Sequence, residues 1–332
     1  MSLTQAILEG NRLSLTRLLT QVENDSPEGQ NALAELFLHT GKAHLIGVTG
    51  APGTGKSSLV NQLTLYYRKE QSKKVAIIAV DPSSPFTGGA VLGDRVRMRD
   101  LSGDNGVFIR SMASRGSVGG LAQKTAAFVQ VFDAAGYEII VIETVGAGQS
   151  EVDIAELAHT TIVVEAPGLG DDIQAIKAGI LEIADVLVVN KADRPGVENT
   201  ERALRSTLEL AHPVKRMFRH HGQTMSVDVP EADTAIWIPP ILKTISTEGK
   251  GIAELADSIA RHAAHLRQSG DWDSRDRTRL RSELEAILQE ELMDRFMKDI
   301  QQSEYENMLD KITQRNISPY DAVRFLLNSK VK

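Results

Sequence analysis

The hydrophobic residues of this chain follow two patterns, and each pattern predicts a different kind of element. Short, mainly apolar runs occupy residues 45–48, 75–80, 139–142 and 185–189, and each run ends in a polar or glycine-rich segment. Runs of this length, bounded by turn residues, are typical of strands that are buried on both faces. Such strands belong to parallel sheets, whose connections are usually helices. The pattern therefore predicts an α/β fold with a mostly parallel central sheet flanked by helices.

Apolar residues recur at helical spacing near both ends of the chain. At the N-terminus a polar break at residues 23–30 separates two predicted helices, which we expect to pack beside the sheet rather than to form a partner-binding arm. Their apolar positions are Ala6, Ile7, Leu13, Leu15, Leu18, Leu19, Leu33, Leu36 and Phe37.

The C-terminal part begins with residues 270–276, which we expect to form a polar linker. A long helix with an apolar stripe follows, and this stripe could fold back on its own domain or meet the same helix of a second chain. Ser318 and Pro319 predict the start of a last helix, with Ser as N-cap and Pro at its first position. The stripe consists of Leu280, Leu284, Ile287, Leu288, Leu292, Met293, Phe296 and Ile300.

The segment after the first apolar run matches the phosphate-binding pattern G-x-x-x-x-G-K-[ST]. A predicted strand precedes it and a predicted helix follows it, which argues against a chance glycine turn. Glycines let backbone N–H groups surround a triphosphate at a helix N-terminus. The lysine would reach the β- and γ-phosphates, and the last hydroxyl would hold Mg²⁺. The residues are Gly50, Ala51, Pro52, Gly53, Thr54, Gly55, Lys56 and Ser57, with Ser58 directly after them.

The fourth apolar run leads into Asn190-Lys191-Ala192-Asp193, the N-K-x-D pattern that reads guanine in GTPases. The Asp193 carboxylate can accept from N1–H and the exocyclic amine of guanine, whereas adenine offers a lone pair at N1 and no amine at C2. Sites built on such bonds reject the wrong base by about 10⁴–10⁵. Lys191 can lie along the base, and Asn190 can tie this loop to the phosphate loop. Ser246 is a candidate for the loop that contacts the guanine oxygen, or a plain polar loop residue.

The second and third apolar runs place carboxylates at the carboxyl ends of parallel strands, where α/β sheets bind ligands. Asp81 and Glu143 occupy these positions. Each could hold Mg²⁺ directly or through water, or could instead cap a loop or helix. Gly146 is a candidate γ-phosphate sensor through its N–H group. Asp94 is a third metal candidate, although by itself it resembles a solvated acid paired with neighbouring arginines.

These motifs together resemble the MeaB/ArgK GTPases, the G-protein chaperones of cobalamin-dependent acyl-CoA mutases of the methylmalonyl-CoA type. The resemblance covers nearly the whole chain, and the stretches after Asp81 and Glu143 are its most specific part. It does not extend clearly to residues 211–235, which include His220 and His221. The matching segments are residues 50–58, 81–84, 93–98, 111–116, 143–151, 170–177, 190–193 and 237–240.

The resemblance implies the roles of further residues and the organisation of the chain. It implies that Mg²⁺ is handled by Ser57, Asp81, Asp94 and Glu143. It also implies a switch segment, with Asp171, Asp172, Gln174 and Lys177, that couples the nucleotide state to the mutase. It favours a homodimer formed by the long C-terminal helix. The expected domains are an N-terminal helical extension at 1–42, a P-loop GTPase domain at 43–268 and a C-terminal helical dimerisation arm at 269–332.

The position after the switch glycine predicts slow intrinsic hydrolysis. In small GTPases a glutamine directly after this glycine orients the attacking water. Here Ala147 follows Gly146, and the nearest glutamine is Gln149. A partner would therefore complete the site. Lys177 could bring a positive charge to the phosphates or could be a solvated helix residue, and the resemblance favours the first. The candidate catalytic residues are Lys56, Glu143, Gln149 and Lys177.

Composition narrows the class of protein. The 332 residues suggest one large α/β domain with appendages, and 42% apolar residues are ample for its core. The net charge of −7 argues against nucleic acid as the main partner. The absence of cysteine excludes disulfides and Cys-based metal sites. No signal-like or membrane-spanning apolar segment is evident, so we expect a cytoplasmic protein without a membrane partner.

Two other classes of P-loop protein are alternatives. A small-molecule kinase is disfavoured by the guanine-reading motif and by the lack of an evident acceptor-binding module. A metal-delivery GTPase has a similar core but usually carries Cys/His clusters. The adjacent pair His220-His221 does not place both rings on one helix face, so we interpret it as part of a surface loop. We therefore expect a homodimeric, Mg²⁺-dependent GTPase that binds GTP and GDP and gates cofactor loading and protection of a cobalamin-dependent acyl-CoA mutase.

Overall fold

The computed structural model describes residues 2–82, 98–101, 103–114, 120–144, 156–168, 183–211, 216–220, 223–227 and 236–328. Contacts divide the chain into two compact units, Met1–Arg279 and Leu280–Lys332.

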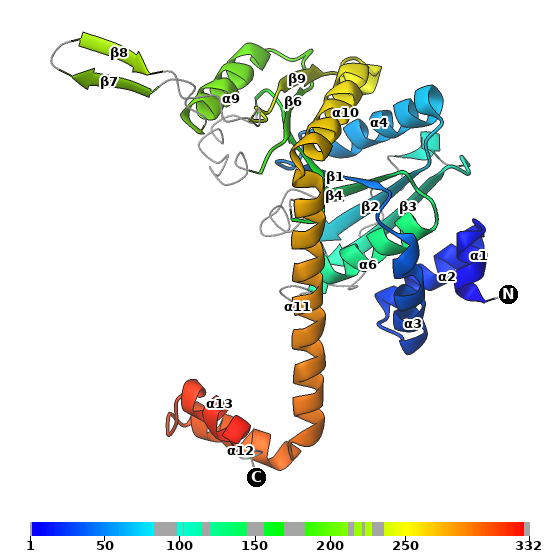
Figure 1. The fold of residues 1–332 in the computed structure, drawn as a ribbon, viewed down its shortest axis with the longest axis vertical. Helices are drawn as coiled ribbons and strands as arrows, with labels where there is room; N and C mark the ends of the chain where they lie inside the picture. The colour runs from blue at the N-terminus through cyan, green and yellow to red at the C-terminus, as the bar shows by residue number, and fades with distance from the viewer. Residues whose placement is uncertain are drawn as a thin grey trace. The chain divides into compact units, whose positions relative to one another are not determined.

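A parallel sheet of seven described strands forms the centre of the first unit (Figure 1). The strand order is β3-β2-β4-β1-β5-β6-β9, and all neighbouring strands run parallel. The four apolar runs form β1, β2, β4 and β6, which confirms the predicted strands and fold class. The strands are β1 His44–Thr49, β2 Val75–Pro82, β3 Val107–Ser114, β4 Ile139–Thr144, β5 Thr160–Glu165, β6 Val186–Asn190 and β9 Ile241–Thr244.

Helices cover both faces of the sheet, because alternate side chains of each strand point to opposite faces. Ile140 and Ile142 of β4 pack in one cluster with α6 and the N-terminal helices, whereas Ile139 and Val141 pack in another with α4 and α10. A third cluster joins β6 to α9. The described helices that lie wholly within this unit are α1 Leu3–Leu8, α2 Arg12–Glu23, α3 Pro27–Leu36, α4 Lys56–Gln71, α6 Gly120–Ala134, α9 Val197–Ala211 and α10 Ile252–Ser269, with short 3₁₀ helices η1 Phe37–His39, η2 Arg99–Leu101 and η4 Ser246–Glu248.

The N-terminal helices are part of this core, as expected. Leu18 and Leu36 are fully buried and share a cluster with the strands. The Asp133 carboxylate on α6 accepts the backbone N–H groups of residues 41–43 and so fixes the connection into β1. The structure has three helices, α1 to α3, where two were predicted. The polar break predicted at 23–30 is shorter in the structure, because α2 ends at Glu23 and α3 begins at Pro27 with Ser26 as its N-cap. Leu13 and Phe37 of the predicted apolar face are exposed.

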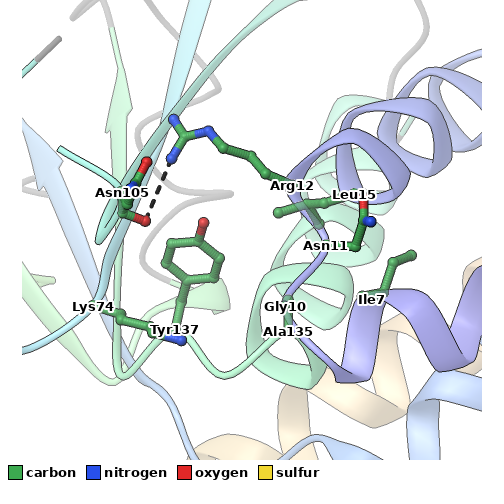
Figure 2. A pocket seen from close by; sticks show the side chains of 9 residues that line it. All are labelled: Ile7, Gly10, Asn11, Arg12, Leu15, Lys74, Asn105, Ala135 and Tyr137. Atoms are coloured by element: carbon green, nitrogen blue, oxygen red, sulfur yellow. Dashed lines mark hydrogen bonds between the residues drawn. The ribbon is translucent and has the colours of Figure 1, made fainter. Parts of the chain in front are cut away.

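A small cavity of about 50 Å³ lies where the turn between α1 and α2 meets the sheet (Figure 2). The Arg12 side chain reaches across it, donates weakly to the Asn105 carbonyl oxygen at 3.4 Å and lies 4.9 Å from the Phe108 ring centroid. Tyr137 lines the same cavity and is buried, and this burial raises the pKa of its hydroxyl. These contacts fasten the N-terminal helices to the loops at this edge of the sheet.

The polar linker predicted at residues 270–276 is wrong. Gly270, at φ 81°, ends α10, and α11 Asp271–Asp299 begins at once. Trp272 is buried, with Ala263 and Leu266 in its cluster. Arg275 and Asp276 of this segment find partners on His159 and Asp185, which directly precede β5 and β6, so the segment is helical and packed rather than solvated.

These partners form a polar cluster at the amino ends of β1, β5 and β6. We call it the sheet foot, and it consists of His44, His159, Thr160, Asp185, Trp237, His262, Trp272, Arg275 and Asp276. Arg275 of α11 donates two hydrogen bonds to the Asp185 carboxylate, both 2.8 Å. Asp185 also accepts from the Thr161 N–H at 2.8 Å and contacts His262 Nε2 at 3.2 Å. The first turns of α11 are therefore fastened to the residue that precedes β6.

Two histidines of the sheet foot, His44 and His159, are buried in surroundings that favour the neutral imidazole. His159 Nδ1 accepts the Leu45 N–H at 3.1 Å, which leaves Nε2 to donate to Asp276 at 2.9 Å. Thr160 Oγ1 lies between His44 Nε2 at 2.8 Å and His262 Nδ1 at 2.9 Å. Burial lowers the pKa of His44 far below its ordinary value, with further lowering by the charge of His159. Burial also lowers the pKa of His159, although Asp276 opposes this shift.

The second unit has its own small core. It contains the rest of α11 with α12 Gln302–Thr313 and α13 Pro319–Asn328, packed around Ile300, Met308, Ala322 and Leu326. The Ser318 hydroxyl accepts the Asp321 N–H at 3.1 Å, which confirms the predicted start of the last helix. Most of the predicted stripe on α11 is exposed in the single chain, with Leu284 at 65% and Leu288 at 52%.

Residues 216–220 and 223–227 form an antiparallel hairpin of β7 Arg216–His220 and β8 Gln223–Val227. His220 thus ends a strand rather than lying in a loop, and His221 is outside the described residues. Among the described residues no group of three or more His, Asp or Glu is arranged to hold a metal ion. No described helix is long and apolar enough to cross a membrane.

Candidate nucleotide site

The phosphate-loop motif connects the carboxyl end of β1 to the first turn of α4, and two of its glycines are required by space. Gly50 has φ 135°, and a Cβ there would lie 2.1 Å from the Val164 carbonyl oxygen. Gly55 has φ 95°, and a Cβ there would lie 2.5 Å from Asn190 Nδ2. L-residues with side chains rarely adopt these angles. The loop can therefore follow this path only with glycine at both positions.

The loop wraps around the amine of Lys56. Lys56 Nζ donates to the carbonyl oxygens of Gly50 at 2.7 Å and Ala51 at 3.0 Å, and its side chain is buried. The Thr54 hydroxyl donates to the same Ala51 oxygen at 2.9 Å and closes the turn. The ammonium group is thus held within the loop at the N-terminus of α4, where the helix dipole also favours an anion.

Ser57 at the start of α4 contacts Glu143 near the end of β4. The Ser57 hydroxyl donates to Glu143 Oε1 at 2.6 Å, and Glu143 is 5% exposed near the end of β4. A hydroxyl and a carboxylate are hard oxygen donors, and these suit Mg²⁺. This donor chemistry fits the metal, whose site would then lie beside the phosphate loop.

Asn190 is the hub between the phosphate loop and the guanine loop. Its Nδ2 donates to the Thr54 carbonyl oxygen at 2.9 Å. Its Oδ1 accepts from the Thr244 hydroxyl at 3.0 Å and from both the hydroxyl and N–H of Ser246, at 2.7 and 3.2 Å. Asn190 is 2% exposed. Ser246 is buried too, so it is not a plain surface loop residue, and it holds Asn190 in place.

Lys191 and Asp193 continue from this hub towards the phosphate loop. Lys191 has a left-handed backbone, φ 56°, and its Nζ donates to the Gly53 carbonyl oxygen at 2.6 Å. Asp193 is exposed, as is Ser58 on the first turn of α4. The stem of Lys191 thus runs beside the phosphate loop, with the Asp193 carboxylate open to solvent.

Several predicted residues cannot be placed. Asp81 is the last residue but one of β2, the strand next to β4, and its side chain is outside the described residues. Also outside them are Asp94, Gly146, Gln149, Asp171, Asp172, Gln174 and Lys177.

Other residues of the site were not singled out by the sequence. The hydroxyls of Thr49 and Thr144 are bonded at 3.2 Å between the ends of β1 and β4. Thr244 supports Asn190 from β9. Each is a threonine at a strand end, where a β-branched residue is expected for packing alone, so composition gave no signal.

Comparison with known proteins assigns the family. A family model described as methylmalonyl-CoA mutase-associated GTPase MeaB matches residues 15–301. The chain belongs to this family. A Pyrococcus abyssi chain assigned as a GTPase is 42% identical, over 98% of this chain and 95% of its own length. The GTPase ArgK of Escherichia coli is 35% identical, over 79% of this chain and 75% of ArgK.

Two further comparisons extend this MeaB assignment. The Caenorhabditis elegans mitochondrial methylmalonic aciduria type A homolog is 29% identical, over 89% of this chain and 74% of its own length. A crystal structure titled LAO/AO transport system kinase matches with a TM-score of 0.69 at 26% identity, over 98% of this chain and 95% of that one. This MeaB-family chain is a GTP hydrolase with a P-loop GTPase fold, and it binds guanine nucleotides.

Proposed function

We propose that this MeaB-family GTPase is a Mg²⁺-dependent chaperone that gates cofactor loading and protection of a cobalamin-dependent acyl-CoA mutase. The observation that carries the proposal is that the phosphate loop contacts both a candidate metal carboxylate and the guanine loop, because Ser57 donates to Glu143 and Asn190 donates to the Thr54 carbonyl oxygen. A mutase partner is supported by the family description, which names a mutase-associated GTPase, and by the name of the nematode relative.

The proposed nucleotide site assigns the phosphates to the loop and Mg²⁺ to the oxygen donors beside it. Lys56 contacts the β- and γ-phosphates, and Ser57 and Glu143 hold the ion, together with Asp81 and Asp94. Bound Mg²⁺ neutralises charge on the phosphates. The 2.6 Å contact between Ser57 and Glu143 supports this assignment. The nucleotide contacts proposed are residues 50–58, Gly146, Asn190, Lys191, Asp193 and Ser246.

Selection of guanine is assigned to Asp193. Its carboxylate accepts the two N–H groups of guanine that adenine lacks, while Lys191 covers one face of the base. The contact of Lys191 with Gly53 and the exposure of Asp193 support this assignment, because they leave the carboxylate available beside the phosphate loop.

Regulation is assigned to the segment with Asp171, Asp172, Gln174 and Lys177. Without a glutamine directly after Gly146, hydrolysis by the isolated chain is slow, and Gln149 and Lys177 contribute when the mutase reorders the site. This segment thereby couples the nucleotide state to the mutase.

The proposed assembly is a cytoplasmic homodimer. Residues 1–42 serve as a helical extension, 43–268 as the GTPase domain and 269–332 as the dimerisation arm. The exposed leucines of α11 support a second copy as the partner of this arm, since a long apolar stripe in water is unfavourable.

The test is GTP turnover with and without a purified cobalamin-dependent acyl-CoA mutase from the same host. We expect hydrolysis to rise at least ~10-fold with the mutase, well within the range that GTPase partners reach. Lys177→Ala should lose most of the rise and retain basal turnover, whereas Lys69→Ala, an exposed lysine on α4, is the matched control. A mutase that neither binds the GTP-loaded protein nor changes its turnover would contradict the proposed partner.

A further inference from the structure

The backbone ladder between β1 and β4 ends just before the nucleotide site. Its register runs from His44 opposite Ile139 to Val48 opposite Glu143. On its other side β1 pairs with β5, and that ladder extends one residue further, to Thr49 opposite Val163. The two strands then lead into different segments, because β1 continues into the phosphate loop and β4 continues into the residues that follow Thr144.

One side-chain contact continues the connection past this point. The Thr144 hydroxyl donates to the Thr49 hydroxyl at 3.2 Å, and the two residues are 1% and 0% exposed. Thr49 immediately precedes Gly50, and Thr144 immediately follows Glu143. The hydroxyl pair is therefore the last described link between the root of the phosphate loop and the strand that carries Glu143.

The Thr49–Thr144 pair lies next to the Ser57–Glu143 contact, whose length depends on the separation of the ends of β1 and β4. Ser57 and Glu143 are joined at 2.6 Å, from α4 and β4. A shift of the β4 end relative to β1 would move the carboxylate away from the hydroxyl. A metal ion with strict octahedral geometry, such as Mg²⁺, would be sensitive to such a shift. The hydrogen bond from the Asn190 side-chain amide to the Thr54 carbonyl oxygen would not be affected, since Asn190 lies on β6.

We propose that Thr49 and Thr144 are positioning residues for GTP hydrolysis, which act by holding Glu143 in register with Ser57. The inference rests on the proposed roles of these two residues in holding Mg²⁺. Threonine suits both positions, because its β-branched side chain fits a buried strand and its hydroxyl supplies the link. Their role is indirect, because both hydroxyls are used in the bond between the two strands.

The test uses the full-length Thr144→Val variant, which keeps the shape of the side chain and removes the hydroxyl. We expect kcat to fall about tenfold, the scale of one buried hydrogen bond, and the Mg²⁺ concentration for half-maximal stimulation of GDP binding to rise several-fold. GDP affinity without Mg²⁺, measured by calorimetry, should stay within about twofold of the wild type. Thr144→Ser should restore both kcat and the Mg²⁺ dependence.

Two controls separate positioning from a general loss of packing. Thr125→Val removes another buried threonine hydroxyl, on α6, and should change none of these quantities. The double variant Thr49→Val with Thr144→Val should be no worse than the single variants, because both remove the same bond. An unchanged Mg²⁺ dependence in Thr144→Val, or an equal loss of Mg²⁺-free GDP affinity, would overturn the inference. Failure of the wild type to respond to Mg²⁺ would instead contradict the proposed metal site.

Discussion

At the scale of single residues, the site depends on groups that hold other groups. The Asn190 amide donates to the phosphate loop and accepts from Ser246. The Lys56 amine donates to the carbonyl oxygens of Gly50 and Ala51 in the phosphate loop. Both side chains are buried, and their hydrogen bonds hold them in fixed orientations without a ligand. Preorganised donors of this kind stabilise developing charge more than mobile ones in water. Substitutions in the phosphate loop should therefore change GTP turnover, whereas substitutions in the guanine loop should change which base is bound.

Asp193→Asn should change which nucleotide is bound. The amide keeps one acceptor oxygen for N1–H and can donate to the oxygen that xanthine carries at C2, but it lacks the second acceptor that the guanine amine requires, so preference should shift from GDP to XDP. Calorimetric titration with GDP, ADP and XDP measures the change, and Asp257→Asn on α10 is a matched acid-to-amide control. Equal affinity of the wild type for GDP and ADP would contradict the role of Asp193.

Lys56→Ala and Glu143→Ala should each lower GTP turnover by more than ~100-fold, the effect expected when a charge-stabilising group is removed. Phosphate release at saturating Mg²⁺ measures the loss. Lys69→Ala and Glu138→Ala are the matched controls, since Lys69 is exposed at the end of α4 and Glu138 is exposed just before β4 begins. Near-normal turnover of Glu143→Ala would mean that this carboxylate only caps Ser57.

At the scale of elements, hydrogen bonds in the sheet foot hold the first turns of α11 against the strands. Burial alone would raise the pKa of Asp185, but hydrogen bonds from His262 and Arg275 outweigh it and lower the pKa. Burial likewise opposes ionisation of Asp276, and the hydrogen bond with His159 and the charge of Arg279 lower its pKa overall. The carboxylates therefore stay ionised while His44 and His159 stay neutral, and α11 is bound through this combination.

This combination predicts that stability falls with acid in two windows. The pKa values of His44 and His159 are lower in the folded chain than in the unfolded chain. As pH falls below about 6.5, the unfolded chain therefore binds protons at these histidines while the folded chain does not, and the folded state loses stability. The two carboxylates, also with lowered pKa values, lose their contribution only below about pH 4. The melting temperature should thus fall between pH 7.5 and 5.5. His44→Gln should flatten this dependence, with His39→Gln as the control for loss of an exposed imidazole. A melting temperature independent of pH in this range would contradict the prediction.

Local motifs explain how much of these elements the sequence predicted. The phosphate and guanine motifs are contiguous, and their strands are apolar runs, so both could be located. β3 includes Arg110 and β9 is only four residues long, so neither gives a strong strand signal. The helical start of α11 was missed because Arg275 and Asp276 read as solvated polar residues. Their partners lie about 90 and 117 residues earlier, and a sequence pattern does not reveal such pairs.

At the scale of the whole molecule, the chain exposes apolar surface that its own described contacts leave open. Leu284 and Leu288 are four residues apart and lie on one face of α11. In a homodimer each copy would present the same patch to the other, as a two-fold axis requires.

Leu284→Asp combined with Leu288→Asp should convert the dimer to a monomer, because two charges would be buried without partners at the interface. Light scattering after size exclusion gives the mass, and GDP binding should be retained. Leu13→Asp changes a leucine that is 62% exposed on α2 and is the matched control. A wild type that is monomeric at tens of micromolar would contradict the proposed arm.

The sheet foot also makes this protein its own optical reporter. The sequence contains two tryptophans, and both lie there. Trp237 Nε1 donates to the Asp185 carbonyl oxygen at 2.8 Å, and Trp272 stacks on His159 with 3.8 Å between ring centroids. Tryptophan emission from unlabelled protein, excited at wavelengths that its five tyrosines do not absorb, therefore comes from the end of the sheet opposite the phosphate loop. A change in this emission when GTP binds would be a direct signal that nucleotide occupancy reaches the root of α11.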